Sequence, residues 1–391
     1  MDKTPSLIGG RRAGWIRMRL HFNILKVTLQ FFRNPLKSVK ALKQLKAFRR
    51  KQQGLERIFK FVKSGQRYFW SSEIPGFPSP QLEQVIKSEM ARNMPSKNLN
   101  GGRPGLQTLI WGITNRCPLN CIHCYDWENI DTKDKLNLDQ LLEVLRHIEE
   151  VGIRHIQLSG GEPLVRFNDL IQILKKASKK MDCWLLTSGF GLTNEKALAL
   201  KEAGLIGVNI SLDHWDEKKH NAFRRNDHSF EWVKKAAKHC RESGLMVSLS
   251  LCATRDFVSK ENLWAYADLA KDWGVHFIRI LEARAVGSFA GKDVHLNKQS
   301  IEQISAFFHQ VNSDPHFKEY PIVNFFGYHQ REIGCMGAGN RYFYIDANAG
   351  VHACPFCRGS KGNVLETPLA ESIERLRETG CHFFKDQDLQ Q

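Results

Sequence analysis

The sequence predicts an α/β fold built on a parallel sheet, and three observations point to this class. Six apolar runs with the length of β-strands alternate with helical segments between residues 106 and 282. Each repeat is roughly 30 residues long, which suits a strand–helix–strand unit. Four of the predicted helices end at C-cap glycines, which are Gly152, Gly204, Gly244 and Gly274. Such repeats form parallel sheets with right-handed crossovers, but periodicity alone does not decide between an open sheet and a barrel.

The composition is that of a globular protein with a strongly basic beginning. Of the 391 residues, 42% are apolar and 25% are charged. Residues 1–66 hold 17 Lys and Arg but only Asp2 and Glu56 as acidic residues, so they carry +15 of the net charge of +16. The ten cysteines cluster by spacing and do not form a small secreted disulfide pattern, which predicts a reducing, cytoplasmic environment. No uncharged run is long enough to predict a transmembrane helix.

The residues before 106 predict a basic helical region with turn-rich breaks. Residues 1–12 show no periodicity and predict a loose arm. Asn34 and Pro35 suit the N-cap and first position of a helix, and the helix that follows interleaves lysines with aliphatic residues. The other elements expected here are a helix over 15–32, a helical piece through Ile58, Phe59, Phe61 and Val62, a break at 74–80, a short helix over 81–92 and a linker over 98–105.

From residue 106 onward, predicted strands and helices alternate. The strands are expected at 108–114, 153–159, 183–188, 206–212, 245–252 and 275–282. The helices between them are expected at 137–151, 168–180, 194–203, 230–243 and 260–273. Beyond these we expect a helix at 298–312, a strand at 322–326, and a hairpin formed by 342–346 and 349–353.

Three cysteines follow the first predicted strand with three and two residues between them. Cys117, Cys121 and Cys124 are close enough in sequence to hold an iron–sulfur cluster, whose usual ligands are Cys thiolates. Three ligands leave one iron of a four-iron cluster without a protein partner, and an open position on a metal is where chemistry with an added molecule takes place. Two alternatives remain on spacing alone, namely half of a zinc site or ordinary buried cysteines.

Further polar motifs fall at the ends of other predicted strands. In parallel βα folds, the carboxyl ends of the strands gather reactive groups at one rim. The residues placed there are Gly160, Gly161 and Glu162 after the second strand, Thr187, Ser188 and Gly189 after the third, Ser211 and Asp213 on the fourth, and Arg279 and Glu282 on the sixth. This shared placement predicts one common site.

The Cys117–Cys124 run followed by Tyr125, together with Gly160-Gly161-Glu162-Pro163 on the next strand, resembles the motifs of the radical S-adenosylmethionine (radical SAM) enzymes. The resemblance covers roughly residues 106–300. It implies a partial six-stranded (β/α) barrel related to the TIM barrel. It also implies a [4Fe-4S] cluster on the three cysteines, SAM chelated to the open iron, and formation of a 5′-deoxyadenosyl radical.

The resemblance also implies roles for residues that would bind SAM. Glycines at 160 and 161 let backbone approach the ligand, and Glu162 would accept a hydrogen bond from the ammonium group of SAM. Ser211 and Asp213 would contact the ribose or methionyl part. Arg224, which with His220 resembles a His-x3-Arg found in relatives, would pair with the SAM carboxylate.

Several of these residues also have a purely structural interpretation. Ser211 and Asp213 can cap the following helix, and Arg279 can belong to a structural ion pair. Cys183, Cys240 and Cys252 are expected to be buried apolar cysteines. His123 is expected to pack or to donate a hydrogen bond within the cluster loop.

The C-terminal tail carries a second set of cysteines, namely Cys335, Cys354, Cys357 and Cys381. With the predicted hairpin between them, they resemble the auxiliary-cluster extension called twitch, the short relative of the SPASM domain. A full SPASM domain has about seven cysteines for two clusters, so four predict one auxiliary [4Fe-4S] cluster. A zinc site built around Cys354 and Cys357 is the alternative.

The sequence therefore predicts three parts: a basic helical extension at 1–105, a radical SAM core at 106–300, and an auxiliary-cluster region at 301–391. We expect an enzyme that abstracts hydrogen from a peptide, lipid or small-molecule substrate and takes electrons from a donor such as flavodoxin or ferredoxin. Glu282 is its candidate catalytic residue. The alternative function is a zinc- or cluster-bearing nucleic-acid-binding protein without SAM chemistry, although no specific nucleic-acid recognition motif is present.

Residues 15–66 predict peripheral contact with an anionic membrane, on its inner, cytoplasmic face. Apolar residues such as Trp15 and Phe22 offer bulk for burial, and the neighbouring lysines attract acidic lipids. The alternative is a helical subdomain that packs on the barrel and leaves its lysines in water.

Overall fold

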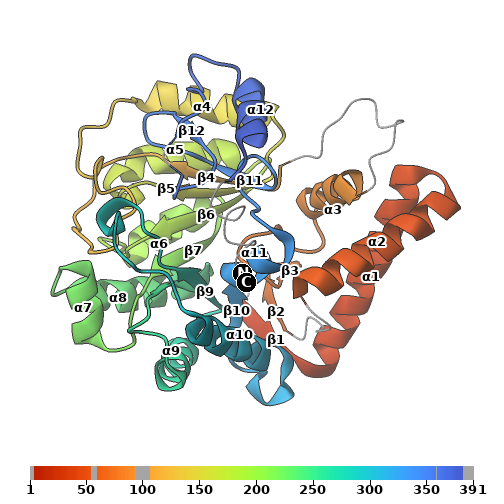
Figure 1. Cartoon of the computed structure of the whole chain (residues 1–391), viewed down its shortest axis with the longest axis horizontal. Helices are drawn as coiled ribbons and strands as arrows, with labels where there is room; N and C mark the ends of the chain where they lie inside the picture. The colour runs from red at the N-terminus through yellow and green to blue at the C-terminus, as the bar shows by residue number, and fades with distance from the viewer. Residues whose placement is uncertain (1–3, 54–59, 94–105, 358, 382–391) are drawn as a thin grey trace.

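The computed structural model describes residues 4–53, 60–93, 106–357 and 359–381 (Figure 1). Its centre is a nine-stranded sheet in the order β10-β9-β8-β7-β6-β5-β4-β11-β12. The strands of this sheet are β4 (Thr108–Gly112), β5 (His155–Ser159), β6 (Asp182–Thr187), β7 (Leu205–Ser211), β8 (Met246–Ala253), β9 (Phe277–Glu282), β10 (Ile322–Phe325), β11 (Tyr342–Ile345) and β12 (Val351–His352). The predicted α/β class is confirmed.

Strands β4 to β9 lie side by side in chain order and are all parallel, as six successive βα units require. The sheet curves into a partial barrel that does not close, since β10 and β12 are its two ends. The helices that connect and follow these strands are α4 (Leu138–Glu150), α5 (Phe167–Ala177), α6 (Asn194–Glu202), α7 (Glu217–Arg224), α8 (Ser229–Glu242), α9 (Lys260–Asp272) and α10 (Lys298–Ser313), with short 3-10 turns η1 (Pro163–Arg166), η2 (Gly287–Phe289) and η3 (Pro315–Phe317).

Local sequence signals explain where these helices begin and end. The Asn137 side chain accepts from the backbone of Gln140 and the Gln140 side chain accepts from the backbone of Asn137, which forms a capping box on α4. All four predicted C-cap glycines have a positive φ, between 62° and 98°. The six core strands and their five connecting helices are confirmed. The short helix α7 was not expected, because it is polar and only eight residues long.

The C-terminal part continues the same sheet instead of standing apart. The predicted hairpin is confirmed as β11 and β12, but β11 also pairs in parallel with β4, and β10 pairs in parallel with β9. Residues far apart in the sequence thus flank the core strands on both sides. Two further helices, α11 (Phe326–Ile333) and α12 (Leu369–Thr379), belong to this part.

The N-terminal extension forms a second, three-stranded sheet from β1 (Ser6–Ile8), β2 (Phe61–Ser64) and β3 (Arg67–Phe69). The expected loose arm at residues 1–12 is therefore wrong where it is described, since β1 lies there and a helix begins at Gly10. The expected helix through Phe61 and Val62 is also wrong, while Ile58 and Phe59 lie outside the described residues. The segment forms a strand because its successive side chains point to opposite faces. Phe61 and Val62 are both fully buried, but each in a different apolar cluster.

This small sheet covers the amino ends of the barrel strands. Val62 and Phe69 pack with Trp184, Phe277 and Ile322, which all belong to core strands. Polar contacts reinforce this arrangement. The Lys60 ammonium donates to the carbonyls of Phe317, Tyr320 and Pro321 at 2.9–3.2 Å, and Arg67 donates to both oxygens of Asp182 at 2.7 and 2.9 Å.

Three helices complete the extension, namely α1 (Gly10–Phe32), α2 (Pro35–Gln53) and α3 (Pro80–Asn93). They pack against one another, and α2 also packs against α11. The Asn34 cap is confirmed, because its side chain accepts from the Lys37 amide at 3.1 Å. The expected linker at 98–105 lies outside the described residues. In Figure 1 the red and orange α1–α2 pair projects from the side of the barrel where α3 and α11 also lie.

Candidate active site at the carboxyl ends of the strands

A cavity of about 660 Å³ opens along the inside of the barrel. It is lined at one end by the three cysteines of the loop after β4, Cys117, Cys121 and Cys124, and by residues from the ends of the neighbouring strands. The volume falls within the range of about 300–1,000 Å³ that is typical of small-molecule sites. Most of the residues predicted for the shared rim line this cavity, but Glu162 and Gly189 do not.

Backbone contacts hold the cysteine loop in place. The Ile122 amide donates to the Phe223 carbonyl at 3.2 Å, and the Ser288 amide donates to the Cys124 carbonyl at 2.9 Å. Gly287 has a φ of +56° and lies so close to the Cys124 carbonyl that no side chain fits there. Burial raises the pKa of Cys117 to about 12 and that of Cys124 to about 11. A bound cation would be needed to keep these thiols ionised at neutral pH.

An arginine connects this loop to the end of β7. The Arg224 Nη1 lies 3.6 Å from the Cys121 sulfur, and its Nε donates to Asp213 Oδ2 at 2.6 Å. Asp213 Oδ1 accepts from the Cys252 amide at 3.0 Å. Burial acts to raise the pKa of Asp213, but the charge of Arg224, the neighbouring histidines and the hydrogen bond from the Cys252 amide together outweigh it, so this pKa lies below its usual value.

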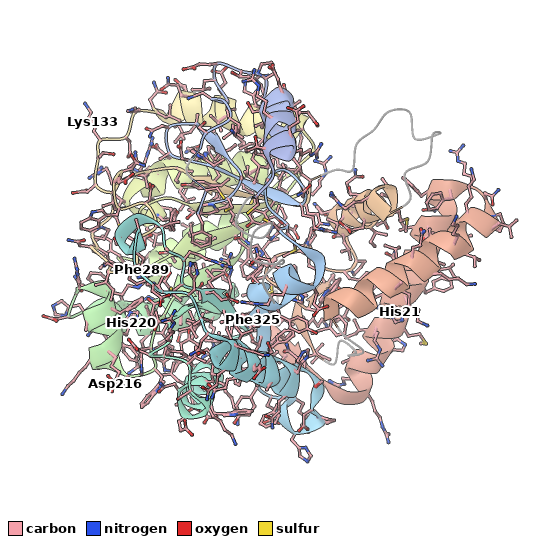
Figure 2. All side chains as sticks on the ribbon, in the orientation of Figure 1. His21, Lys133, Asp216, His220, Phe289 and Phe325 are labelled. Carbon is pink, nitrogen blue, oxygen red and sulfur yellow. The ribbon has the colours of Figure 1, made fainter. Side chains whose placement is uncertain are left out.

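The residues that follow β7 support this pair and do not cap the next helix. Asp216 is the N-cap of α7, so the capping interpretation of Ser211 and Asp213 is wrong. His220 accepts from the Asp213 amide through Nδ1 at 3.1 Å. In Figure 2 the labelled Asp216, just before α7, and His220, on α7, lie across the barrel from His21 on α1. Ser211, Asp213 and Arg224 all line the cavity.

The structure places the Glu162 side chain differently from the expectation. Its carboxylate is fully buried and does not line the cavity. It accepts from the Leu164 amide at 3.1 Å, the Thr187 hydroxyl at 2.8 Å, and the amide and hydroxyl of Ser188 at 2.7 and 2.6 Å. Glu162 thus fastens the end of β6 to the turn after β5, and Thr187 and Ser188 face the cavity in its place.

The two glycines before Glu162 let this turn pack on the cysteine loop. A Cβ on Gly160 would lie 2.5 Å from the Thr114 carbonyl oxygen, and one on Gly161 would lie 2.4 Å from the Arg116 carbonyl oxygen. The close approach permits hydrogen bonds from the Gly161 amide to Thr114 at 2.7 Å and from the Glu162 amide to Arg116 at 2.8 Å. Both glycines also line the cavity.

The candidate catalytic residue Glu282 is held in an ion pair. Its two oxygens accept from the Arg331 guanidinium of α11 at 2.6 and 2.9 Å, and Arg284 lies 3.9 Å away. Gly327 lies beside it, and a Cβ there would overlap the Glu282 carboxylate unless this side chain moved. The charge of Glu282 is therefore already balanced by protein groups at the cavity wall.

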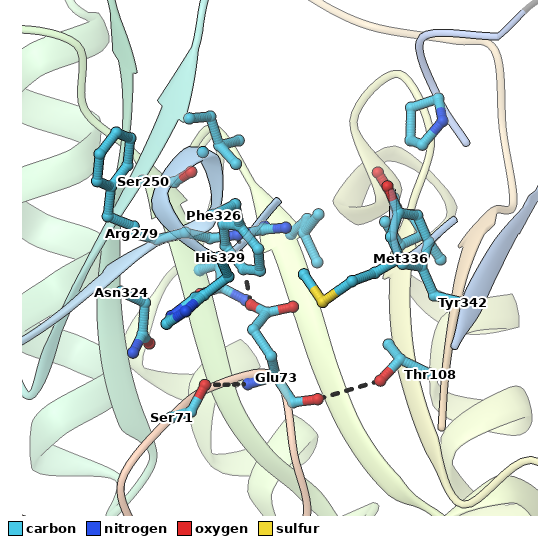
Figure 3. A pocket seen from close by; sticks show the side chains of 18 of the residues that line it. Ser71, Glu73, Thr108, Ser250, Arg279, Asn324, Phe326, His329, Met336 and Tyr342 are labelled. Carbon is cyan, nitrogen blue, oxygen red and sulfur yellow. Dashed lines mark hydrogen bonds and ion pairs between the residues drawn. The ribbon is translucent and has the colours of Figure 1, made fainter. Parts of the chain in front are cut away.

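Arg279 is also paired, which agrees with its structural interpretation. Its Nε lies 3.3 Å from Glu73 Oε1, and its guanidinium lies over the ring of Phe326 at 5.1 Å. Figure 3 shows Glu73 reaching into the cavity toward Arg279 and Phe326, with Met336 and Tyr342 on the opposite wall. Glu73 belongs to the N-terminal extension, and no motif in the sequence indicated that it would reach this site.

The four tail cysteines come together beside Tyr342. The sulfurs of Cys354 and Cys357 are 3.4 Å apart, and the Cys381 thiol hydrogen-bonds with both Cys335 and Cys357. Their mutual hydrogen bonds raise the pKa of Cys335 and Cys357 and lower that of Cys354. No three His, Cys, Asp or Glu side chains in the described ranges already have the geometry of a single-ion site. A four-cysteine group of this kind fits either a cluster or zinc.

Aromatic side chains link the two groups of cysteines. Tyr125, next to the first group, contacts Phe356 at 6.2 Å between ring centres and Tyr344 at 6.4 Å. His123 stacks on Phe223 at 4.5 Å, so its packing role is observed. Cys183 and Cys240 are fully buried, as expected, whereas Cys252 is partly exposed and lines the cavity.

Comparison with known proteins agrees with this architecture. Residues 111–273 match the family described as the Radical SAM superfamily. An AdoMet-dependent heme synthase of Nitratidesulfovibrio vulgaris is 24% identical over 306 residues, which cover 70% of this chain and 80% of that protein. A GTP 3′,8-cyclase of Clostridium perfringens is 31% identical over 180 residues, 45% of this chain and 54% of that protein, so the chain spans only about half of this relative.

Two solved structures share the fold. SuiB of Streptococcus suis bound to the precursor peptide SuiA has a TM-score of 0.56 at 15% identity, covering 75% of this chain and 69% of that chain. Native anSMEcpe with bound AdoMet and the Cp18Cys peptide has a TM-score of 0.55 at 18% identity, covering 69% of this chain and 80% of that chain. At these identities the likeness concerns the fold alone.

Proposed function

From the radical SAM domain, which makes this chain an enzyme of that superfamily, we propose that it cleaves SAM reductively and abstracts hydrogen from a substrate held in the barrel cavity. A [4Fe-4S] cluster and SAM are the cofactors of this superfamily. The observation that carries the proposal is the placement of Cys117, Cys121 and Cys124 at one end of the cavity, with Arg224 against Cys121. The match to the Radical SAM superfamily favours this function over the alternative of a nucleic-acid-binding protein without SAM chemistry.

The residues present fit the cluster and SAM. The three cysteines would hold three irons as thiolates, and their buried thiols would release their protons to solvent when the metal binds. When bound, the cluster supplies the electron that splits SAM into methionine and a 5′-deoxyadenosyl radical, which takes a hydrogen atom from the substrate. Gly160, Gly161, Ser211, Asp213 and Arg224 would surround SAM.

The chain's own residues orient these groups and balance their charge. Arg224 keeps a fixed positive charge beside a cluster thiolate and is itself held by Asp213. We assign Glu162 a positioning role, because it holds Thr187 and Ser188 at the cavity wall. Glu282, the candidate catalytic residue, would contact the substrate as a carboxylate that stays paired with Arg331 at the cavity wall.

The tail would hold one auxiliary [4Fe-4S] cluster in a SPASM/twitch-like region. Four thiols that already contact one another match the usual four-cysteine ligation. This cluster would accept an electron from the product radical or anchor the substrate. We propose the same three parts as above for the chain: the extension at 1–105, the radical SAM core at 106–300, and the auxiliary-cluster region at 301–391.

Residues 15–66 would provide contact with the inner, cytoplasmic face of a membrane. No helix in the described part of the chain is long and apolar enough to span a bilayer. The side chains available for surface contact are exposed along α1 and the start of α2, namely Trp15, Met18, Phe22, Leu25, Leu29, Leu36 and Val39. The electron donor would be a flavodoxin or ferredoxin, and the substrate a peptide, lipid or small molecule.

Electron paramagnetic resonance of the anaerobically reconstituted, dithionite-reduced protein tests the proposal. If SAM binds at an iron of the cluster, adding SAM will change the cluster's signal. A Cys117→Ala/Cys121→Ala/Cys124→Ala variant should keep only the auxiliary signal, without a response to SAM. A reduced wild-type spectrum that SAM leaves unchanged would contradict the proposal.

A further inference from the structure

The cavity has two chemically different ends. Near the cluster cysteines its wall is polar, with Ser188, Asn209, Ser211 and Ser250 contributed by successive core strands. Asn209 is almost completely buried, and neither its amide nitrogen nor its oxygen has a hydrogen-bond partner. Buried amides without partners are rare in folded proteins. The Asn209 side chain therefore offers an unpaired donor and an unpaired acceptor to a group bound in the cavity.

The other end of the cavity is apolar and is walled by the N-terminal extension. Leu20 and Ile24 come from α1, Val85 and Ile86 from α3, and Trp70 from the segment after β3. This wall lies where the partial barrel remains open. On one side of the opening α3 is bound to the start of β11 by the Glu89–Arg341 ion pair at 3.0 Å, and on the other side α2 packs on α11.

Charged side chains along the cavity are paired within the protein. Four ion pairs involve residues of the cavity wall, namely Glu73 with Arg279, Glu89 with Arg341, Glu282 with Arg331, and Asp213 with Arg224. The cavity-lining Lys60 donates to three backbone carbonyls. The two charges of each pair balance each other, so these side chains offer few free charges to a ligand that is charged along its whole length. The wall between the polar and apolar ends thus suits an uncharged, flexible chain better than a peptide with many polar groups.

The outer face of α1 has a different surface. Trp15, Met18, Phe22, Leu25 and Leu29 recur at steps of three and four residues, so they form one stripe that faces away from the cavity wall. Phe22 is 72% exposed. Residues 10–53 contain no Asp or Glu, and Arg and Lys side chains flank the stripe. In Figure 2 side chains extend from the outer side of the projecting α1–α2 pair.

We infer that the substrate is a long-chain amphiphile that enters from an anionic membrane surface and lies with its apolar chain between α1 and α3. Its polar end would face Asn209 and the cluster end of the cavity. One face of α1 would rest on the lipid surface while its other face walls the cavity. This inference rests on the proposed function and names the class of substrate for the same site.

The test is calorimetric titration of the full-length, anaerobically reconstituted protein with single-chain amphiphiles below their critical micelle concentration. The probes are lysophosphatidylglycerols with sixteen- and eight-carbon chains, and the head group glycerophosphoglycerol alone. We expect at least tenfold tighter binding of the longer chain than of the shorter one, and no measurable binding of the head group. Binding that is independent of chain length would overturn the inference.

Two substitutions on α1 distinguish the role of its cavity face from the role of its outer face. Ile24→Trp fills the apolar end of the cavity and should weaken binding of the sixteen-carbon amphiphile at least tenfold. Phe22→Ser on the outer stripe should leave this affinity unchanged but reduce flotation with vesicles of phosphatidylglycerol. Equal effects of both variants on the monomeric amphiphile would overturn the assignment of the faces.

The outcomes also separate this inference from the proposed function. Wild-type protein that forms 5′-deoxyadenosine but binds no amphiphile would overturn the inference alone. Protein that binds the amphiphile but never cleaves SAM would overturn the proposed function. If an apolar peptide binds in a manner that Ile24→Trp abolishes, while the amphiphiles do not bind, the occupant is a peptide and the inference is wrong.

Discussion

The Arg224 guanidinium lies 3.6 Å from the sulfur of Cys121, while the same side chain holds Asp213 at 2.6 Å. Both Arg224 and Asp213 are at least nine-tenths buried. The sequence led us to expect Arg224 to pair with a SAM carboxylate. The structure shows that it already contacts the cysteine loop, and that its charge is balanced by Asp213, which follows β7.

Replacing Arg224 should therefore destabilise the fold and alter the cluster. Arg224→Lys loses the guanidinium group that contacts both Cys121 and Asp213. The Asp213 carboxylate is then buried without a good partner, which costs about 3–5 kcal/mol. Hydrogen bonds to cluster sulfurs influence the reduction potential, so the midpoint of the SAM-binding cluster should also move. Urea unfolding and redox titration measure the two effects. The exposed neighbour Arg225→Lys is the control, and equal behaviour of both variants would contradict this role.

Glu162 should act through the strand end that it holds. Glu162→Gln keeps the shape but replaces an acceptor by an NH₂ group facing donors, which costs about 1–3 kcal/mol for each buried group left unsatisfied. We expect lower stability, weaker SAM binding and unchanged iron content. Equilibrium dialysis with labelled SAM and iron analysis check this. Full SAM affinity in a destabilised variant would show that Glu162 supports only the fold.

His276 should make stability depend on pH. Burial lowers its pKa from 6.5 to about 4, and its Nδ1 accepts from the Val247 amide at 3.0 Å. Because the pKa is lower in the folded state, the unfolded chain binds more protons between about pH 4 and 6.5. Stability is therefore complete above pH 6.5 and falls as the pH drops through this window, by about 2 kcal/mol between pH 7 and 5.

His276→Asn keeps an acceptor for Val247 without the titrating ring, so its unfolding free energy should vary less with pH. Urea denaturation of the metal-free protein at pH 7 and 5 gives the comparison, with the exposed His228→Asn as the matched control. If His276→Asn and wild type lose the same stability, His276 does not carry this pH dependence.

The tail cysteines should hold iron independently of the first group. Cys354→Ala should lower the iron content from about eight to about four per chain, since each [4Fe-4S] cluster contributes four irons. Uncoupled cleavage of SAM should persist, while turnover of the true substrate should stop. Cys183→Ala, a fully buried cysteine outside both groups, should keep all iron. One equivalent of zinc in the wild-type tail would contradict the auxiliary cluster.

Periodic signals in the sequence were sufficient for the core. The six strands from β4 to β9 are apolar, five of them carry a polar motif at or after their carboxyl end, and the C-cap glycines separate the repeats. The cavity therefore contains Cys117, Cys121, Cys124, Ser211 and Asp213 together, as the shared rim predicted. Local pattern and tertiary structure agree here because each βα unit is stabilised largely by neighbours in sequence.

The contacts that the sequence did not reveal are long-range and depend on single residues. Strands β1 to β3 have only three or four residues each, and β1 pairs with β2 across more than 50 residues. Glu73 enters the cavity from the extension to meet Arg279, and Glu162 turns away from it to bind Ser188. Neither contact has a periodic signal, because packing of distant segments decides which way each carboxylate points.

The central claim is that Cys117, Cys121 and Cys124 hold the cluster that cleaves SAM. The most direct measurement is 5′-deoxyadenosine formed by the anaerobically reconstituted, dithionite-reduced protein, alongside the variant with all three cysteines changed to alanine. Wild-type protein should form 5′-deoxyadenosine, and the variant should form none while keeping about four of about eight irons, because the tail cluster has its own ligands. Formation of 5′-deoxyadenosine by the variant, or its absence from fully reconstituted wild-type protein, would contradict the claim.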